Sequence, residues 1–325
     1  SSGDLVDLGL IVAFHVLPTI IFFGALMSVL FHLGVVQRVV KSVAVVMQRT
    51  MGTSGSESLS AAGNIFVGQT EAPLVVKSYL PQMTQSELMA VMCGGFATVA
   101  GGVLAAYTRF GLDPGHLLAA SVMSAPAALV IAKIMLPESE TSATGAGATE
   151  SPERTTTNVI DAAATGATDG LKLAANVGAM LIAFIGLIAL LNYLIGLTGS
   201  LVGFDRLVLA DIFGTLFYPL SWCMGVDTQD LGNFGNLLGI KVSINEFVAF
   251  VELGALRGQM TERSVVIATY ALTGFANFSS IGIQIGGLAA LAPERRQDLA
   301  ALGLKAMIGG AIASWITACI AGVIL

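Results

Sequence analysis

GNIFVGQTEAP, at residues 63–73, sets an amide, a hydroxyl and a carboxylate side by side at Gln69, Thr70 and Glu71. Apolar sequence flanks the stretch on both sides. A carboxylate is expensive at membrane depth, so an acidic residue kept there indicates a functional site. The glycines and Pro73 interrupt a continuous helix, and backbone groups freed at that depth must line a cavity or be buried in protein. We therefore predict a re-entrant hairpin with a polar tip. The apolar flanks disfavour the alternative, a polar loop outside the bilayer.

Composition assigns the chain to the all-α polytopic membrane proteins. Charged residues make up 11% of the 325 residues, against about 25% in an average soluble domain. The mean hydropathy is +0.82, and several apolar runs reach the roughly 20 residues that span hydrocarbon. A soluble protein would have to bury all of these runs as core helices. The formal net charge is −6 and the sequence has no basic patch, so we expect no nucleic-acid partner.

The apolar runs and their interruptions predict the order of elements. Residues 35–51 carry Arg and Lys among Val and Met, which is typical of a basic amphipathic helix lying in the membrane interface. Glycines around Thr98 break the apolar run at 84–110. The remaining predicted elements are a first span at 8–34, the hairpin at 54–80, a span at 113–136, a loop at 137–157, a helix over 158–198 with a span at 171–198, an interfacial region at 205–230, a second hairpin at 231–256, a second broken helix at 264–291 and a last span at 302–325.

The order of hairpin, broken helix and span occurs twice. Met-Thr opens the segment that reaches GFAT at 95–98, and Met-Thr at 260–261 opens the segment that reaches GFAN at 274–277. Each segment follows a hairpin that carries an acidic residue, Glu71 or Glu246. Paired Gly-interrupted segments in two halves of a chain indicate a transporter binding site. Chance similarity of Gly-rich helices would account for the matched letters alone, but not for the shared order of three elements.

The distribution of charge favours two repeats of opposite orientation. With 35–53, 137–157 and 292–301 on the cytoplasmic side, most Lys and Arg residues lie on or near that side, as the positive-inside rule requires. Lys241 falls in the minority on the outer side. The first hairpin then enters from the cytoplasm and the second from outside, as inverted repeats. The predicted divisions are 1–53 (first span and interfacial helix, assigned to a scaffold), 54–136 (first repeat), 137–230 (loop, scaffold span and interfacial region) and 231–325 (second repeat).

Longer stretches of the sequence resemble a known family. GNIFVGQTEAPLVV at 63–76 resembles the signature of the concentrative nucleoside transporters, in particular the bacterial sodium-coupled type. Asn-Glu-Phe at 245–247 and GFANFSS at 274–280 resemble that family's second signature region. The match runs from about residue 10 to the end and includes the PERR turn at 293–296. Members of this family normally carry further membrane helices ahead of the first span seen here.

The resemblance implies a homotrimer in the lipid bilayer, in which each subunit has a scaffold and a transport domain built from the two repeats. It implies nucleobase contacts by Gln69, Thr70, Glu71 and Val103. It implies ribose contacts by Glu246, Asn277 and Ser280, with Phe275 packing nearby. It implies a sodium site at Asn64, Val67, Thr98 and Val99.

The residue types agree with these roles on chemical grounds. An ionised carboxylate such as Glu246 only accepts hydrogen bonds, which suits a pair of ribose hydroxyl donors, and an amide can contact both donors and acceptors of a base edge. Sodium is a hard cation, and unwound backbone carbonyls together with Asn64 and Thr98 supply oxygen ligands. The structural alternatives are interhelical hydrogen bonds by Asn64 and Thr98, worth ~0.6 kcal/mol each, plain packing by Phe275, and a bond from Ser279 to the backbone of its own helix.

We predict sodium-coupled symport of nucleosides (the uridine, cytidine and adenosine class) into the cell by alternating access, in a bacterial inner membrane, and no enzymatic activity. A proton-coupled nucleoside transporter is the near alternative, with Glu71 or Glu246 as the proton carrier. Both residues fit a purely structural role poorly, because a buried charge without a partner is costly. An intramembrane enzyme is disfavoured because no Ser/His pair, HExxH or two-carboxylate zinc pattern lies within the spans. A channel is disfavoured because two separate polar tips suit an occluded site better than a continuous wet path.

Overall fold

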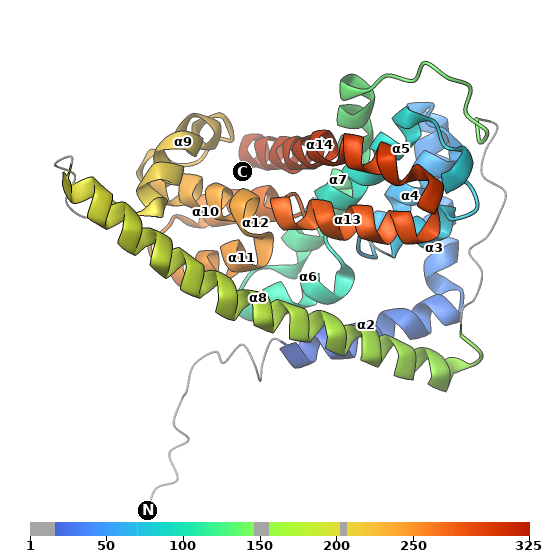
Figure 1. Cartoon of the computed structure of the whole chain (residues 1–325), viewed down its shortest axis with the longest axis horizontal. Coiled ribbons are helices and arrows are strands. Elements are labelled where there is room, and N and C mark those ends of the chain that lie inside the picture. The colour runs from blue at the N-terminus through green and yellow to red at the C-terminus, as the bar shows by residue number, and fades with distance from the viewer. Residues whose placement is uncertain (1–16, 70, 146–155, 202–206) are drawn as a thin grey trace, which may run out of the picture.

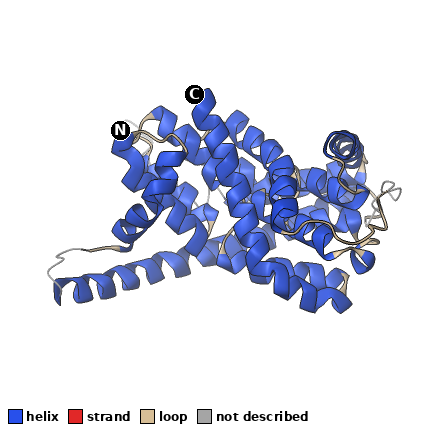
Figure 2. Ribbon diagram, turned by 90° about the horizontal axis from the view of Figure 1, so that it is seen from above, coloured by secondary structure: helices blue, strands red, loops and turns tan. Residues whose placement is uncertain are grey.

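The computed structural model describes residues 17–69, 71–145, 156–201 and 207–325, and over these ranges it consists of helices and loops without strands (Figures 1 and 2). The α-helices are α2 (Leu17–His32), α3 (Val35–Met51), α4 (Gly55–Asn64), α5 (Gln85–Ala97), α6 (Gly101–Tyr107), α7 (Pro114–Met135), α8 (Val159–Leu201), α9 (Leu209–Cys223), α10 (Leu231–Ser243), α11 (Glu246–Leu256), α12 (Glu262–Leu272), α13 (Phe278–Leu291) and α14 (Arg296–Ile324). The short 3-10 helices are η1 (Ala72–Val76), η2 (Leu80–Gln82), η3 (Thr108–Phe110), η4 (Thr228–Asp230) and η5 (Pro293–Arg295).

The order of hairpin, broken helix and span occurs twice in the structure. The first hairpin pairs α4 with η1, and the second pairs α10 with α11. The broken helices are α5 with α6 and α12 with α13, and the spans that follow are α7 and α14. Within the described ranges, three helical stretches are long and apolar enough to cross a membrane: Gln85–Phe110, Pro114–Met135 and Pro293–Ile324. The predicted fold class is confirmed.

The first hairpin has one α-helical arm and one 3-10 arm. The α-helix α4 ends at Asn64, and Pro73 lies in the first turn of η1. Proline is tolerated in a first turn because its missing N–H would have no partner within the helix there. The chain therefore turns between the two arms, and the prediction that the glycines and Pro73 prevent one continuous helix is confirmed.

The two breaks fall at different places relative to the matched letters GFAT and GFAN. Residues 95–97 are the last residues of α5, whereas residues 274–276 lie in the break after α12 has ended. Thr98 follows α5 as its C-cap, but Asn277 opens α13 as its N-cap. The two four-letter matches therefore do not occupy equivalent positions, although the elements that contain them do.

The longest helix, α8, is continuous over 43 residues and runs along one edge of the molecule beside α2 (Figure 1). Glycines allow the two helices to approach closely. A Cβ built on Gly166 would lie 2.5 Å from the carbonyl oxygen of Gly24, and one on Gly170 would lie 2.9 Å from Cα of Ile21. Small residues four positions apart are typical of helix pairs in membranes. Residues 8–16 of the predicted first span and 146–155 of the predicted loop lie outside the described residues.

Helix α3 follows α2 at an angle of 74° and packs toward the first repeat. Its apolar face, Val36, Val40, Ala44 and Met47, is buried in one core cluster with residues of α4, α5 and α7. Arg38 and the other basic side chains lie on the exposed face. The predicted amphipathic pattern is present, and packing joins α3 to the first repeat although the sequence divisions grouped it with the first span.

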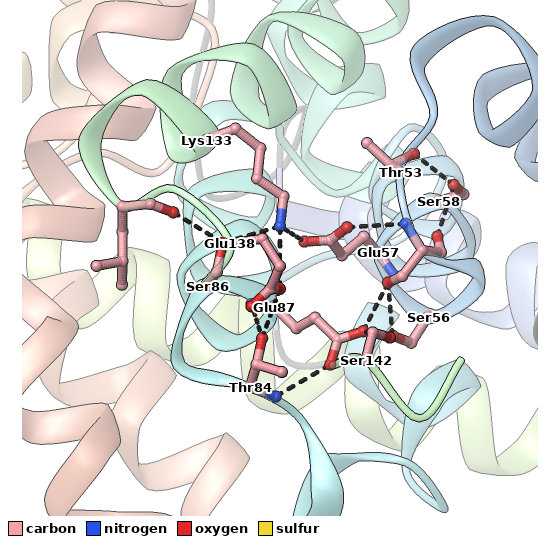
Figure 3. Close-up of polar contacts among 12 residues, drawn as sticks. Thr53, Ser56, Glu57, Ser58, Thr84, Ser86, Glu87, Lys133, Glu138 and Ser142 are labelled. Atoms are coloured by element: carbon pink, nitrogen blue, oxygen red, sulfur yellow. Dashed lines mark hydrogen bonds and ion pairs between the residues drawn. The ribbon is translucent and has the colours of Figure 1, made fainter. Parts of the chain in front are cut away.

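A group of polar contacts, which we call the first clasp, joins the starts of α4 and α5 (Figure 3). Ser54 and Thr84 N-cap these helices, each in a capping box with the acidic residue three positions later, Glu57 or Glu87. The Glu87 carboxylate also accepts a hydrogen bond from Ser54 Oγ at 2.6 Å. Lys133 of α7 forms an ion pair with Glu57. The first clasp therefore binds the hairpin, the broken helix and the span of the first repeat to one another.

The second repeat has an equivalent group of contacts, the second clasp, between the starts of α10 and α12. Thr261 N-caps α12, and its backbone N–H donates to Asp230 Oδ2 at 3.0 Å. Its hydroxyl lies 2.6 Å from Asp227 Oδ2. Thr84 and Thr261, which follow Met in both repeats, are thus equivalent N-caps. The Met-Thr match in the sequence therefore corresponds to a true structural equivalence.

Replacing Glu87 with Ala is expected to lower the free energy of unfolding by about 3 kcal/mol, because it leaves buried hydroxyl and amide donors without an acceptor. Thermal inactivation of the purified protein in detergent, followed by size-exclusion chromatography, measures the effect. The control is Glu140→Ala, at an exposed carboxylate of the loop after α7. Equal thermal stability of the two variants would show that the first clasp does not hold the repeat together.

Candidate functional site

The two helix breaks touch each other. Gly274, with φ +113°, lies in the break between α12 and α13. A Cβ at this position would lie 2.7 Å from the carbonyl oxygens of both Phe96 and Ala97, the last residues of α5. The positive φ and the close approach both require glycine. Unwound backbone from the two repeats therefore comes together at one place, which is the architecture of a transporter binding site.

Glu246, the first residue of α11, is buried between the two repeats. It is 4% exposed and lies at a helix amino terminus, which favours negative charge. Its Oε1 accepts a hydrogen bond from the hydroxyl of Tyr107 in α6 at 3.2 Å, and its Oε2 accepts one from Asn277 Nδ2 at 3.1 Å. Because Tyr107 belongs to the first repeat and Asn277 to the second, the carboxylate joins both. Its predicted burial is confirmed.

Asn277 is held in place by the helix that it caps. Its Oδ1 accepts hydrogen bonds from the Ser280 backbone N–H at 2.9 Å and from the Ser279 hydroxyl at 2.7 Å. Ser280 is also buried. Because Asn277 is hydrogen-bonded to both Glu246 and Ser280, the structure brings these three residues together. The Ser279 hydroxyl thus bonds the side chain of the N-cap residue and not the helix backbone that its structural alternative named. Phe275 is half-buried and packs against the core cluster that includes residues of the second hairpin.

Lys241, which the count of charges placed on the outer side, is completely buried within the protein. Its ammonium donates hydrogen bonds to the carbonyl oxygens of Ala271 at 2.7 Å and Thr273 at 3.2 Å. Glu246, which carries the opposite charge, follows five residues later in the chain. A lysine within an apolar run looks like a boundary charge in the sequence. Lys241 is buried because it lies on the face of α10 that packs against α12. Only the folded structure shows which face this is.

The tip of the first hairpin lies against the break of the first broken helix. The backbone N–H of Gly101 donates to the carbonyl oxygen of Phe66 at 3.2 Å. Val67 lies half-buried in this tip, and Thr98 and Val99 lie buried in the break. The structure therefore brings these three predicted sodium-site residues to the same contact between two elements.

Asn64, the last residue of α4, is 1% exposed, and neither polar atom of its side chain has a hydrogen-bond partner within the described part of the chain. A Cβ built on Gly94 would lie 2.9 Å from Asn64 Nδ2, so the amide faces the last turns of α5. The Thr98 hydroxyl donates to Gly94 O at 2.9 Å and keeps its own oxygen lone pairs. Buried polar groups normally have partners. A buried amide oxygen without a partner, next to unwound backbone, fits a hard cation such as sodium. The alternative role of Asn64, an interhelical hydrogen bond, is absent from the described contacts.

The side chains of Gln69 and Gln284 both lie next to Gly95 of α5. A Cβ at Gly95 would touch the side-chain nitrogen of Gln284 and would lie 3.0 Å from Cβ of Gln69. Both amides are buried, and their Oε1 atoms have no hydrogen-bond partner among the described residues. Gln284 Nε2 donates to Met92 O at 3.0 Å. Gln284 was not predicted, because an amide on the apolar helix α13 forms no motif and only its contact across to α5 reveals it. Val103 is buried in α6.

Glu71 is exposed, so the prediction of a buried carboxylate at the first hairpin tip is wrong. Its carboxylate folds over Gly68, where a Cβ would lie 2.5 Å from Glu71 Oε2. The physical reason is the turn into η1, which buries Ala72 and leaves Glu71 and Leu74 exposed. The cost of burying a charge therefore bears on Glu246 but not on Glu71. Thr70 lies outside the described residues.

Four residues at the end of α5 connect the two halves of the site. Gly94 faces Asn64, Gly95 faces the two buried glutamines, and the carbonyl oxygens of residues 96–97 face Gly274. The break that contains Gly274 also contains Asn277, which binds Glu246. Asn64, Gln69 and Glu246, one residue from each predicted group, are thus joined by one continuous series of contacts drawn from both repeats.

Comparison with protein families agrees with this arrangement. The chain matches the description "Na+ dependent nucleoside transporter C-terminus" over residues 116–322 and the description "Nucleoside recognition" over residues 13–113. The chain belongs to the sodium-dependent nucleoside transporter family. This is a family of membrane transporters and not of enzymes.

Curated relatives from this family are similar along nearly the whole chain. A Haemophilus influenzae protein named as an uncharacterized transporter is 48% identical over 98% of this chain and 77% of its own length. Mouse solute carrier family 28 member 3 is 45% identical over 96% of this chain and 47% of its own length. Mouse sodium/nucleoside cotransporter 1 is 44% identical over 96% of this chain and 51% of its own length. The chain therefore spans about half the length of these mammalian relatives.

Solved structures of the transporter CNTnw have the same fold. The structure in an inward-facing substrate-bound state gives a TM-score of 0.91 at 46% identity, over 96% of this chain and 75% of that chain. A variant of CNTnw in an outward-facing state gives 0.92 at 46% identity, over 97% of this chain and 76% of that chain. The arrangement of hairpins and broken helices described above is therefore the family's fold.

Proposed function

We propose that the protein is a sodium-coupled symporter that carries nucleosides of the uridine, cytidine and adenosine class into the cell by alternating access. The observation that carries the proposal is the series of contacts around residues 94–97, which links the unpartnered Asn64 amide, Gln69 and the buried Glu246 across the two repeats. The name of a sodium/nucleoside cotransporter among the relatives supports it.

Nucleoside binding is assigned to residues of both repeats. In this proposal the Glu246 carboxylate accepts hydrogen bonds from two ribose hydroxyls, because a charged acceptor forms hydrogen bonds roughly twice as strong as a neutral one. Asn277 and Ser280 hold the ribose beside it, and Phe275 packs against the sugar. The nucleobase side of the site consists of Gln69, whose amide both donates and accepts, together with Thr70, Glu71 and Val103.

Sodium is assigned to the contact between the first hairpin tip and the first break. The oxygens proposed to bind it come from the side chains of Asn64 and Thr98 and from the backbone at Val67 and Val99. Sodium bound there orders the hairpin tip that carries Gln69 before the nucleoside arrives, so the two ligands bind cooperatively. By linkage, sodium must tighten nucleoside binding by the same factor by which nucleoside tightens sodium binding.

The moving body is proposed to comprise both hairpins and both broken helices. The two clasps join each hairpin to its broken helix, and the contact of Gly274 with the end of α5 joins the repeats. Helix α8, closely paired with α2, suits a fixed scaffold. Helix α3, which packs against α4, is assigned with α8 to the scaffold. The solved states of CNTnw, named inward-facing, intermediate and outward-facing, support alternating access.

A homotrimer in a bacterial inner membrane is proposed as the working assembly. Large apolar side chains on α8 are more than half exposed, among them Ile182, Ile185, Tyr193 and Leu197. An apolar surface of this kind fits either lipid or another subunit. The relative from Haemophilus influenzae supports the bacterial location.

Replacing Asn64 with Ala is expected to raise the sodium concentration for half-maximal nucleoside uptake by about tenfold, because it removes one oxygen ligand from a charged partner. Saturating sodium should restore part of the rate, since the nucleoside contacts are intact. Uptake by cells or proteoliposomes at graded sodium concentrations measures the shift. Ser60→Ala, at a buried hydroxyl on the same helix, is the control. If Asn64→Ala left the sodium dependence of uptake at the wild-type value, the sodium site would lie elsewhere.

A further inference from the structure

The most completely buried charge in the site belongs to Lys241, to which the proposed function assigns no role. Its side chain lies on α10, the first arm of the second hairpin, and is 0% exposed. Lysine is almost never fully buried unless it is paired. Its ammonium donates to Ala271 O at 2.7 Å and to Thr273 O at 3.2 Å. Both acceptors are carbonyl oxygens at the carboxyl end of α12, immediately before the break.

Lys241 and Glu246 lie on opposite sides of that break. The carboxyl end of α12, which carries partial negative charge, contacts Lys241. The amino end of α13, which carries partial positive charge, is capped by Asn277, and Asn277 Nδ2 donates to Glu246 Oε2 at 3.1 Å. The hairpin thus presents its cation to one end of the broken helix and its carboxylate to the other. Each charge faces the helix end of opposite sign.

The two charges also act on each other. Lys241 and Glu246 stand five positions apart across the tip of the second hairpin, and opposite charges attract each other more strongly in a buried environment than in water. Removal of one member of a buried pair leaves the other uncompensated, which is strongly unfavourable. A carboxyl group that has taken up a proton donates a hydrogen bond from one oxygen, whereas the carboxylate accepts at both. Ribose hydroxyls need acceptors, so the state of Glu246 decides whether the sugar is bound.

We propose that Lys241 is a positioning residue of the ribose subsite. It fixes the carboxyl end of α12 to the second hairpin and supplies the opposite charge that keeps Glu246 an acceptor for the ribose hydroxyls. This inference rests on the proposed function, because it assumes that a nucleoside binds at Glu246. Its specific consequence is that Lys241 governs discrimination for the sugar hydroxyls and not affinity for the base.

The test compares the affinities of the purified protein for uridine and for 2′,3′-dideoxyuridine at saturating sodium. The wild-type protein is expected to prefer uridine. Lys241→Met is expected to lower this preference by about 30-fold or more, the effect of truncating one partner of a buried charged pair. The affinity for the dideoxy compound should change little. Lys241→Arg keeps the charge and should restore part of the preference.

Two controls separate this role from a purely structural one. Lys172→Met removes a lysine on α8 whose side chain is 70% exposed, and it should leave both affinities unchanged. The second control, a double variant, tests the inference even if Lys241→Met alone does not fold. The double variant Lys241→Met/Glu246→Gln carries neither charge and should show the same preference as Glu246→Gln alone, because Lys241 acts through Glu246.

Three results would overturn the inference. The first is that Lys241→Met weakens the binding of uridine and of dideoxyuridine by the same factor. The second is that the double variant prefers uridine over dideoxyuridine much less than Glu246→Gln alone does. The third is that Lys241→Met binds both compounds as the wild-type protein does. Each of these leaves the proposed function standing, because the wild-type protein still binds uridine. Failure of the wild-type protein to bind any nucleoside would instead overturn the proposed function itself.

Discussion

Replacing Glu246 with Gln is expected to weaken nucleoside binding by about 30-fold or more. The amide accepts the two ribose hydroxyls less strongly than the carboxylate does, and the change leaves the buried Lys241 ammonium without its opposite charge. The carboxylate is 4% exposed and already accepts from Tyr107 and Asn277, so its position is fixed before the ligand arrives. Calorimetric titration of the purified variant with uridine measures the loss.

The control for this experiment is Glu252→Gln, which removes a half-buried carboxylate from the same helix, α11. Its affinity for uridine should equal that of the wild-type protein. Wild-type affinity in the Glu246→Gln variant itself would contradict the assignment of the ribose subsite, since no other described residue offers a buried carboxylate beside both helix breaks.

Replacing Gly274 with Ala is expected to reduce uptake by about 100-fold, the effect of displacing a site by about 1 Å. The added Cβ would lie 2.7 Å from two carbonyl oxygens of α5, and the backbone at φ +113° disfavours any side chain. Either the two breaks separate or the peptide rotates, and in both cases Asn277 moves away from Glu246. Gly286→Ala on α13, where a Cβ would meet no atom within 4 Å, is the control. Near-normal uptake by a well-folded Gly274→Ala protein would mean that contact between the breaks is not needed.

The hairpins, breaks and spans could be predicted because their causes are local. Pro73 and the glycines interrupt helices by their backbone chemistry, whatever surrounds them. Thr84 and Thr261 cap helices through their own side chains, and the cap positions follow from that. The order of the elements therefore emerged from apolar runs and their interruptions, and the burial of Glu246 followed from the same pattern.

The details of the site depend on contacts between distant segments, and these could not be predicted. Lys241 entered the sequence analysis only as one charge in the count of inner and outer residues, and its contact with the carboxyl end of α12 is visible only in the folded structure. Glu71 was expected to be buried because the flanking sequence is apolar, but the turn into η1 exposes it. Tyr107 and Gln284 bind across the two repeats, over 139 and 192 residues of chain, and neither belongs to a motif.

In the proposed function, a sodium gradient drives nucleosides through this site. Purified protein in liposomes should accumulate labelled uridine above the outside concentration when sodium is directed inward, and unlabelled uridine inside should accelerate entry by counterflow. A proton gradient without sodium should drive no accumulation. Accumulation driven by protons alone would contradict sodium coupling, and flux that only equalises the concentrations without counterflow would contradict a carrier.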